Sequence, residues 1–201
     1  MSENILYLAS NSQARKQLLS DADIPFQVIS HSATEEFDAS LGLEEIVSIL
    51  AVRKLAHVIL PQISIQRELF VVTADTLVRD KFGIIQNKPK DIEDAKTKIR
   101  AISGKSQVCT AFCLEKREFT GQIWVTKAQI VQAVTSDCYF EIPDSWIDRY
   151  LEHVDVLNIA GAVAIEQYGA QFLKEIQGSY SAILGLPLFE LRGALTKLNF
   201  F

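Results

Sequence analysis

The sequence predicts an α/β fold built around a mixed sheet. Apolar segments of strand length alternate with segments of helical period, two longer strand-like segments follow as a hairpin, and 48% of the 201 residues are hydrophobic. Alternating strands and helices favour parallel pairing, whereas a hairpin adds antiparallel strands. A chain of this length and composition can bury one sizeable core. We therefore expect one domain, residues 1–201.

The first elements are a buried strand, a helix and a second strand. ILYLAS, residues 5–10, is a short apolar run bounded by small polar residues. The helix is expected over 12–22, with Ser12 as its N-cap and paired leucines in its apolar stripe. A strand follows at 25–30, and the polar, acidic residues 31–42 are expected to form a loop.

A longer helix and the most hydrophobic strand come next. The helical stripe over 43–60 predicts an amphipathic helix that Pro61 ends. The β-branched segment 68–78 predicts a strand that runs into Asp75. Residues 81–89, KFGIIQNKP, indicate a hairpin arm followed by a loop.

The middle of the chain predicts a helix and a hairpin. Residues 91–103 have one apolar face and begin with Asp91, which is expected to be the N-cap. Residues 107–118 and 122–135 are strand candidates separated by a Thr-Gly pair, so they are expected to pair with each other.

The C-terminal part starts with a helix over 143–153, in which Pro143 precedes an Asp144 cap. Residues 160–198 combine many small residues, a strand-like piece, a turn at 185–187 and a final helix. Strands that alternate with helices, together with a later hairpin, complete the α/β pattern.

The charge balance limits the partners that we expect. There are 20 Lys and Arg residues against 25 Asp and Glu residues, which gives a net charge of −5. This balance argues against nonspecific binding to nucleic acid or to an anionic membrane. Residues 1–7 lack the features of a signal peptide, and no apolar run approaches the roughly 18 residues that a membrane span requires. We expect a cytoplasmic protein.

The three cysteines do not form a recognisable metal or disulfide pattern. Cys109, Cys113 and Cys138 have no CxxC spacing and no histidines placed as metal partners. Cys109 and Cys113 lie in an apolar run, so we interpret them as core residues and not as reactive thiols.

The start of the first helix has the features of an anion site. A strand that runs through small polar residues into a helix leaves free backbone N–H groups, and the helix dipole favours negative charge there. Ser10 and Ser12 add hydroxyl groups, and Arg15 adds a planar guanidinium suited to phosphate. The alternative is an ordinary serine cap beside a surface arginine, which is the commoner meaning of this pattern taken alone.

Four further charged residues are candidates for chemistry. Asp75 follows the apolar segment FVVTA, and a carboxylate at the C-terminal end of a strand lies where ligands of open α/β sheets collect. Glu35 lies in an acidic loop, and a glutamate in such a loop is usually a solvated surface residue. Lys54 and Lys88 can equally be surface lysines whose stems cover apolar area. Spacing alone does not decide between these interpretations.

The chain resembles the Maf family of nucleoside triphosphate pyrophosphatases. The resemblance covers nearly the whole chain and rests on motifs in the same order and at similar intervals, namely LASNSQARKQLL, TEE, AVRKLA, TADT, NKP, ISGKSQVCTAF, AGAVAIEQYGA and GSYSAILGLPL. It implies a Maf/ITPase-like fold, in which helices flank a mixed, curved sheet and the nucleotide lies in a cleft between two lobes. It also implies a homodimer.

The implied activity is hydrolysis of a nucleoside triphosphate between its α and β phosphates, with Mg²⁺ or Mn²⁺ as the cofactor. By this resemblance Glu35 binds the metal, and Asp75 coordinates the metal or activates water. Lys54 and Lys88 neutralise the triphosphate. Phosphoryl transfer requires this kind of positioning and charge neutralisation more than covalent chemistry, and carboxylates suit both ions.

The resemblance assigns Ser10, Ser12 and Arg15 to phosphate binding at the start of the helix. The family usually has Pro-Arg-Arg after the second serine, whereas this chain has Gln13, Ala14 and Arg15. One of the two phosphate-facing arginines is therefore missing, and we expect a lower affinity for phosphate.

The segment 163–167 departs most from the family. Many members have Tyr-Gly-Ile-Gln-Gly there, and this chain has Val-Ala-Ile-Glu-Gln. Glu166, at the usual glutamine position, is similar to the subgroup that acts on 7-methyl-GTP. A carboxylate can accept hydrogen bonds from guanine and attract a methylated, cationic ring, whereas a carboxamide better suits uracil or thymine. A salt-bridged surface glutamate is the alternative.

We therefore expect a metal-dependent pyrophosphatase, with a modified guanine nucleotide slightly preferred over dTTP or UTP. The alternative hypothesis is a non-catalytic nucleotide-binding regulator of cell division. It is consistent with the role in septum formation that is linked to this family and with the altered arginine and glycine positions. A nucleic-acid-binding module is disfavoured by the acidic charge balance.

Overall fold

The computed structural model describes residues 4–60 and 68–201. Its strands are Leu6–Leu8 (β1), Phe26–Val28 (β2), Ser30–His31 (β3), Val58–Ile59 (β4), Glu68–Arg79 (β5), Ile85–Gln86 (β6), Gly104–Phe119 (β7), Trp124–Phe140 (β8) and Leu173–Gln177 (β9). Its α-helices are Gln13–Asp21 (α1), Leu43–Ala56 (α2), Ile92–Ile102 (α3), Ile147–His153 (α4), Tyr180–Ile183 (α5) and Leu188–Lys197 (α6). Short 3-10 helices are Asp144–Trp146 (η1), Val156–Asn158 (η2), Ala160–Ala162 (η3) and Gln167–Phe172 (η4).

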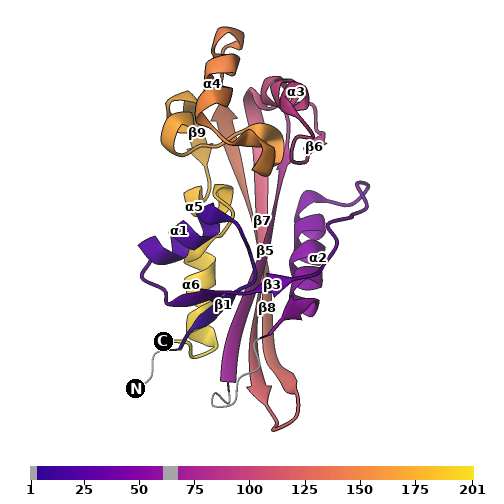
Figure 1. Ribbon diagram of the computed structural model, residues 1–201, viewed down its shortest axis with the longest axis vertical. Helices are drawn as coiled ribbons and strands as arrows, with labels where there is room; N and C mark the ends of the chain where they lie inside the picture. Colours follow the sequence, from indigo (N-terminus) through magenta and orange to yellow (C-terminus); the bar gives the residue numbers. More distant parts are fainter. Residues whose placement is uncertain (1–3, 61–67) are drawn as a thin grey trace.

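A mixed sheet forms the centre of the molecule, as predicted. Its order is β2-β1-β5-β7-β8-β9, and β6 pairs with β5. β1 runs parallel to β2 and β5, whereas the pairs β5–β7, β7–β8 and β8–β9 are antiparallel. The long strands β5, β7 and β8 extend along most of the height of the elongated molecule (Figure 1).

Helices cover both faces of this sheet. In Figure 1, α2 lies on one side of the long strands, and α1 and α6 lie on the other. α3, α4, β6 and β9 gather at the upper end. The molecule therefore has a lower part around β1, α1, α2 and α6 and an upper part around α3 and α4, which the long strands join.

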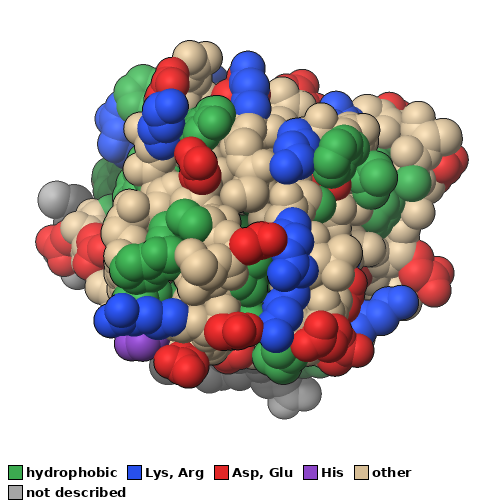
Figure 2. Space-filling view, turned by 90° about the horizontal axis from the view of Figure 1, so that it is seen from above, with side chains coloured by type: hydrophobic (Ala, Val, Ile, Leu, Met, Phe, Trp, Pro, Cys, Tyr) green, Lys and Arg blue, Asp and Glu red, His purple; other side chains and the backbone are tan. Residues whose placement is uncertain are grey.

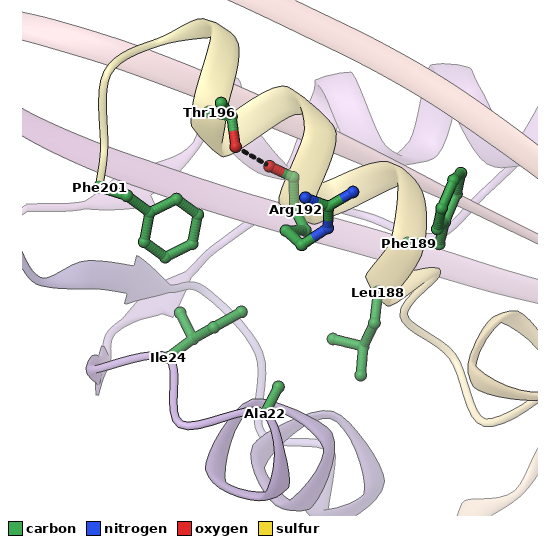
Figure 3. A pocket seen from close by; sticks show the side chains of 7 residues that line it. All are labelled: Ala22, Ile24, Leu188, Phe189, Arg192, Thr196 and Phe201. Carbon is green, nitrogen blue, oxygen red and sulfur yellow. Dashed lines mark hydrogen bonds between the residues drawn. The ribbon is translucent and has the colours of Figure 1, made fainter.

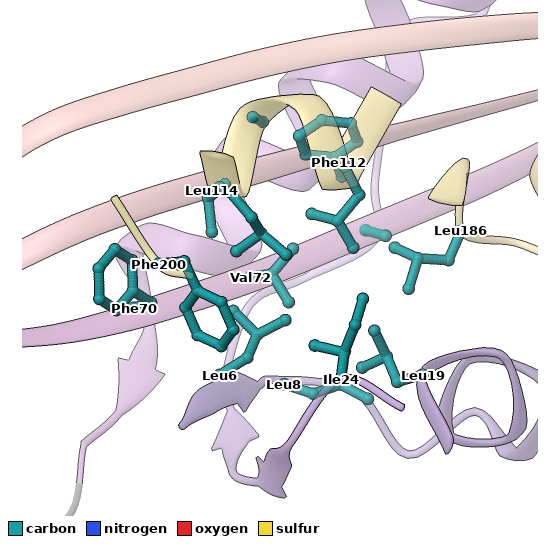
Figure 4. Packing of buried hydrophobic residues seen from close by; sticks show 14 of the residues in the cluster. Leu6, Leu8, Leu19, Ile24, Phe70, Val72, Phe112, Leu114, Leu186 and Phe200 are labelled. Carbon is teal, nitrogen blue, oxygen red and sulfur yellow. The ribbon is translucent and has the colours of Figure 1, made fainter. Parts of the chain in front are cut away.

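The main core lies between the sheet and the helices α1 and α6. Figure 4 shows its side chains, which include Leu6, Leu8, Leu19, Phe70, Val72, Phe112, Leu114, Leu186 and Phe200. The rings of Phe70 and Phe200 meet edge to face with centroids 5.1 Å apart. Because burying one large apolar side chain contributes about 1.5–3 kcal/mol, this cluster fixes both helices against the sheet.

The cysteines are buried free thiols, as expected. Cys109 and Cys113 pack under α2 with Leu50 and Leu55. Burial raises the pKa of the Cys113 thiol to about 12 and that of Cys138 to about 11. At neutral pH these groups therefore remain protonated, which fits packing and not nucleophilic chemistry.

The predicted helix caps at Ser12 and Asp91 are confirmed. Ser12 Oγ accepts a hydrogen bond from the backbone N–H of Arg15, and Asp91 caps α3 through the N–H of Asp94. The expected cap at Asp144 is wrong. A 3-10 turn comes first and α4 starts only at Ile147, so the Asp144 carboxylate instead accepts a hydrogen bond from Arg100 Nε at 3.1 Å.

The boundaries differ most around α2 and in the hairpin. The helix expected over 43–60 ends at Ala56, because Val58 and Ile59 form a short strand with β3. Pro61, which was expected to end this helix, lies outside the described residues. β7 and β8 are each longer than predicted, because β7 already begins at Gly104 and β8 continues to Phe140, and these two residues pair with each other.

Candidate active site

The cap of α1 brings the two predicted serines together. Ser10 Oγ accepts a hydrogen bond from the N–H of Ser12 at 3.3 Å, and Ser12 Oγ accepts one from the N–H of Arg15 at 3.4 Å. Ser10 follows β1, and Ser12 directly precedes the helix. The strand-to-helix turn thus places both hydroxyls at the positive end of the α1 dipole.

Arg15 is not a surface arginine. Its Nε donates to the carbonyl of Gly185 at 2.7 Å, Nη1 donates to Ser10 Oγ at 3.1 Å, and Nη2 donates to Thr76 Oγ1 at 3.1 Å. Burial lowers the pKa of Arg15, and the charges of Asp75 and Glu35 oppose this effect. Because a guanidinium has five N–H groups, one remains on each Nη for a ligand.

Gly185 makes this arrangement of Arg15 possible. Its φ of +107° lies in the region that favours glycine, and a Cβ there would lie 3.2 Å from Thr76 Oγ1 and 3.3 Å from Arg15 Nε. Thr76 in turn contacts Thr110 Oγ1 at 2.8 Å, and Thr110 donates to the carbonyl of Ala182 at 2.6 Å. The chain around α5 is therefore bound to the centre of the sheet beside Asp75.

Lys54 contacts two carboxylates, those of Glu35 and Asp75. It projects from the last turn of α2 toward β5, and it is only 5% exposed. Lys54 Nζ lies 2.8 Å from Glu35 Oε1 and forms an ion pair with Asp75 Oδ1. The alternative interpretation of Lys54 as a surface lysine is therefore wrong. Periodicity alone could not show this, because the partner Asp75 is 21 residues away.

Glu35 is the more exposed member of this group. Its hydrogen bond to Lys54 holds the pKa of the Glu35 carboxyl below its usual value; burial opposes this effect, whereas the charges of Lys54 and Lys88 lower the pKa further. Lys88 lies on the exposed segment after β6. Its charge therefore reaches the same site from the upper part of the molecule.

His31 is a site residue that the sequence analysis missed. It ends β3, and its Nδ1 accepts a hydrogen bond from the N–H of Ala33 at 3.3 Å. Burial lowers the pKa of His31, and the positive charge of Lys54 lowers it further. The one available signal was its place four residues before Glu35, at the end of a strand.

Glu166 lies in the upper part of the molecule. It directly precedes η4. Burial raises the pKa of Tyr150, and the negative charge of Glu166 raises it further. The Tyr150 hydroxyl accepts a hydrogen bond from the N–H of Ala164 at 2.8 Å. The structure thus joins Ser10, Ser12, Arg15, Glu35, Lys54, Asp75 and Lys88 in one region, and it places Glu166 beside a different cluster.

Two hollows lie elsewhere on the molecule. One of about 520 Å³ lies between the end of α1 and α6. Figure 3 shows its mainly apolar lining, which includes Ile24, Leu188, Phe189 and Phe201. The other, of about 380 Å³, is lined by residues such as Trp146 and Phe172. Neither lining contains an Asp–Lys pair of the kind found at Asp75.

Seen from the end that carries α3 and α4, acidic and basic side chains are interspersed over the surface (Figure 2). None of the helices within residues 4–60 and 68–201 is both long enough and apolar enough to cross a membrane.

Comparison with known proteins identifies the family. The profile of the Maf-like protein family matches residues 5–198. A dTTP/UTP pyrophosphatase of Alkaliphilus oremlandii is 32% identical over 97% of this chain and 96% of its own length. Proteins of the same name from Ruminiclostridium cellulolyticum and Xanthomonas euvesicatoria are each 34% identical, over 96% and 97% of this chain and 96% and 99% of their own lengths. The chain therefore belongs to the Maf-like protein family.

Proposed function

We propose that this protein is a nucleoside triphosphate pyrophosphatase, which cleaves its substrate between the α and β phosphates and releases the monophosphate and pyrophosphate. The observation that carries the proposal is the contact of the Lys54 ammonium with both Glu35 and Asp75. A cation and two carboxylates at one point are the groups needed to hold a triphosphate together with a divalent ion. The relatives named as pyrophosphatases support the same reaction.

The positive groups have separate roles in this proposal. Lys54, buried against β5, and Lys88, on an exposed loop, both neutralise the triphosphate. Ser10 and Ser12 hold phosphate oxygens at the start of α1. Arg15 orients Ser10 through Nη1 and offers its two remaining N–H groups to the same oxygens.

The donor set fits a hard divalent ion. Mg²⁺ typically binds through one or two carboxylates and completes its coordination with water and substrate phosphates. Within the described part of the chain, no group of three His, Cys, Asp or Glu side chains could hold a metal. We therefore assign Mg²⁺ or Mn²⁺ to Glu35 and Asp75 in the presence of the substrate. The ion, when bound, withdraws charge from the phosphate oxygens, and Asp75 also orients the attacking water.

The relatives favour dTTP and UTP as substrates, because their printed names give both nucleotides. We adopt this preference over the modified guanine nucleotide. 7-Methyl-GTP remains the second candidate, and the observation that favours it is the carboxylate of Glu166. We propose that the enzyme acts as a single domain in the cytoplasm, where its free thiols stay reduced.

A nucleotide panel tests the proposal. Purified protein is incubated with Mg²⁺ or Mn²⁺ and dTTP, UTP, GTP or 7-methyl-GTP, and pyrophosphate and monophosphate are quantified. We expect equal amounts of the two products from dTTP and UTP. Orthophosphate and a diphosphate as first products would contradict the proposed bond cleavage. Nucleotide binding without turnover of any triphosphate would support the non-catalytic regulator of cell division instead.

Glu166→Gln tests whether this residue reads the base. If the carboxylate binds a methylated guanine, the ratio of kcat/KM for 7-methyl-GTP to that for UTP should fall about ten-fold, which corresponds to about 1.4 kcal/mol. Glu152→Gln, an exposed glutamate on α4, is the control. An unchanged ratio in Glu166→Gln assigns Glu166 to structure.

A further inference from the structure

A buried ion pair on β7 binds the C-terminal end of α2. Glu115 is 5% exposed, and Arg117 Nε lies 2.6 Å from Glu115 Oε2. The two residues are two positions apart, so their side chains share the face of the sheet along which α2 packs (Figure 1). Arg117 Nη2 donates to the carbonyl of Leu55, in the last turn of α2, at 3.3 Å. The pair therefore ties the end of this helix to the sheet.

Stability alone does not explain this pair. Glu115 Oε2 also accepts a hydrogen bond from Thr126 Oγ1 at 3.1 Å, and Oε1 accepts one from Gln129 Nε2 at 2.7 Å. Burying two charges is costly, and apolar side chains of similar volume often replace a buried ion pair without loss of stability. Apolar side chains cannot bind the Leu55 carbonyl, however, because only a donor can hold that oxygen. The contact with α2 is therefore what the charged pair provides.

The Leu55 carbonyl lies next to the residue that α2 contributes to the site. Lys54 directly precedes Leu55, and the helix ends one residue later. On the other side of Lys54, the Ala51 carbonyl accepts a hydrogen bond from Thr73 Oγ1 at 2.7 Å. Thr73 lies two residues before Asp75 on β5, so both side chains are on the same face. The end of α2 is thus held at two backbone oxygens, one before Lys54 and one after it.

The chain beyond α2 leads to the other carboxylate of the site. β4 follows the helix and pairs with β3. The N–H of Ser32, directly after β3, donates to the carbonyl of His57 at 3.1 Å. Glu35 comes three residues after Ser32. A displacement of the end of α2 would therefore move Lys54 and the base of the loop that carries Glu35 together.

We propose that Glu115 and Arg117 are positioning residues for Lys54. Arg117 holds the last turn of α2, and the place of this turn sets where the Lys54 ammonium meets Asp75. Glu115 lies opposite Val71, four residues and about 13 Å before Asp75 along β5, so the pair acts on the site only through the helix. The effect on turnover rests on the proposed function, whereas the placement of Lys54 does not.

The Lys54 ammonium can be observed without any substrate. Its resonance in proton–nitrogen NMR is assigned by its loss in Lys54→Arg. Glu115→Leu/Arg117→Met replaces the pair by apolar side chains, and the resonance should shift or broaden. Arg117→Lys keeps a charge for Glu115 but lacks the fork that also reaches α2, so it should have the same effect. Glu68→Leu/Lys116→Met is the matched control. It removes an ion pair of 2.9 Å whose lysine lies on the other face of β7, and it should leave the resonance unchanged.

Steady-state kinetics with UTP and Mg²⁺ test the consequence for the reaction. In both pair variants kcat should fall about ten-fold or more, whereas KM should change less than about three-fold. The reason is that Lys54 and Asp75 act at the reacting phosphate, while the start of α1 still binds the substrate. The double variant should keep a melting temperature near that of the wild type, because its apolar side chains fill the same space.

Three results would overturn the inference. The first is an unchanged Lys54 resonance in folded pair variants, and the second is an unchanged kcat. The third is an equal loss of kcat in Glu68→Leu/Lys116→Met, which would show a general effect of removing an ion pair. A wild-type protein that releases no pyrophosphate would instead contradict the proposed function, because the resonance still shows whether the pair places Lys54.

Discussion

At Lys54 one ammonium group holds together two carboxylates from distant parts of the chain. Glu35 comes from the loop after β3 and Asp75 from the middle of β5. A buried lysine is costly unless its charge is compensated and its N–H groups have partners, and the Lys54 ammonium pairs with both carboxylates. The three residues therefore act as one unit, and each substitution among them changes both stability and chemistry.

Glu35→Gln should change how stability depends on pH. The pKa of Glu35 is lowered in the folded state, chiefly by its hydrogen bond to Lys54, so the unfolded chain binds more protons in acid. The contact therefore adds stability above the unfolded pKa of about 4.3 and loses it as the pH falls through the lower folded pKa. Urea unfolding from pH 3 to 7 should show a deficit for Glu35→Gln that is largest at pH 7. Glu36→Gln controls for the change in net charge, and an equal deficit there would contradict the assignment.

Arg15→Lys should show that Arg15 is needed for its geometry and not only for its charge. An ammonium cannot reproduce the fork that reaches Gly185, Ser10 and Thr76 together. We expect a lower melting temperature and a kcat/KM for the preferred triphosphate at least ten-fold below that of the wild type. Arg192→Lys, on the exposed face of α6, should change neither value. Wild-type kinetics in Arg15→Lys would show that the positive charge of Arg15 is sufficient and that its planar geometry is not required.

At the scale of elements, local chemistry was predictable and long-range pairing was not. Ser12 and Asp91 could be identified as caps because a cap depends on residues within one turn. The two-residue strands β3 and β4 could not be predicted, since each exists only through the other. The burial of Lys54 depends likewise on β5. The family resemblance supplied the grouping of site residues that periodicity could not.

The start of η4 contains a strained residue. Gln167 has a φ of +50°, in the left-handed region that favours glycine. A left-handed conformation costs a non-glycine residue about 1–2 kcal/mol, which exceeds the roughly 0.5–1 kcal/mol that the greater conformational entropy of glycine costs on folding. Gln167→Gly should therefore raise stability by up to about 1 kcal/mol in urea unfolding.

The same substitution at Gln171, within the same 3-10 helix, is the matched control. Gln171 is exposed, and its side chain donates to the carbonyl of Tyr168 at 2.9 Å. Gln171→Gly should lower stability by about 1 kcal/mol, because glycine gains no strain relief there. Equal losses in both variants would show that the left-handed conformation of Gln167 is not costly.

At the scale of the whole molecule, the site lies where the lower and upper parts meet. Asp75 lies on β5, one of the strands that join the two parts, and the charge of Lys88, on the segment that follows β6, lowers the pKa of Glu35. The mixed α/β architecture was predictable from the alternation of segments. The order of the strands in the sheet was not predictable, because β5 pairs with β1 and β7, which are distant from it in the sequence.

The central claim is that the Asp75 carboxylate, held by Lys54 beside Glu35, is essential for hydrolysis of a triphosphate. The most direct measurement is pyrophosphate release from dTTP or UTP by Asp75→Asn with saturating Mg²⁺, after circular dichroism has confirmed folding. The control is Asp80→Asn, a 5% exposed carboxylate just beyond the end of β5 that accepts hydrogen bonds from Phe82, Ile84 and Gln86. We predict a loss of at least a thousand-fold in kcat for Asp75→Asn, about 4 kcal/mol of transition-state stabilisation, and near wild-type turnover for Asp80→Asn. Wild-type turnover in a folded Asp75→Asn protein would contradict the claim.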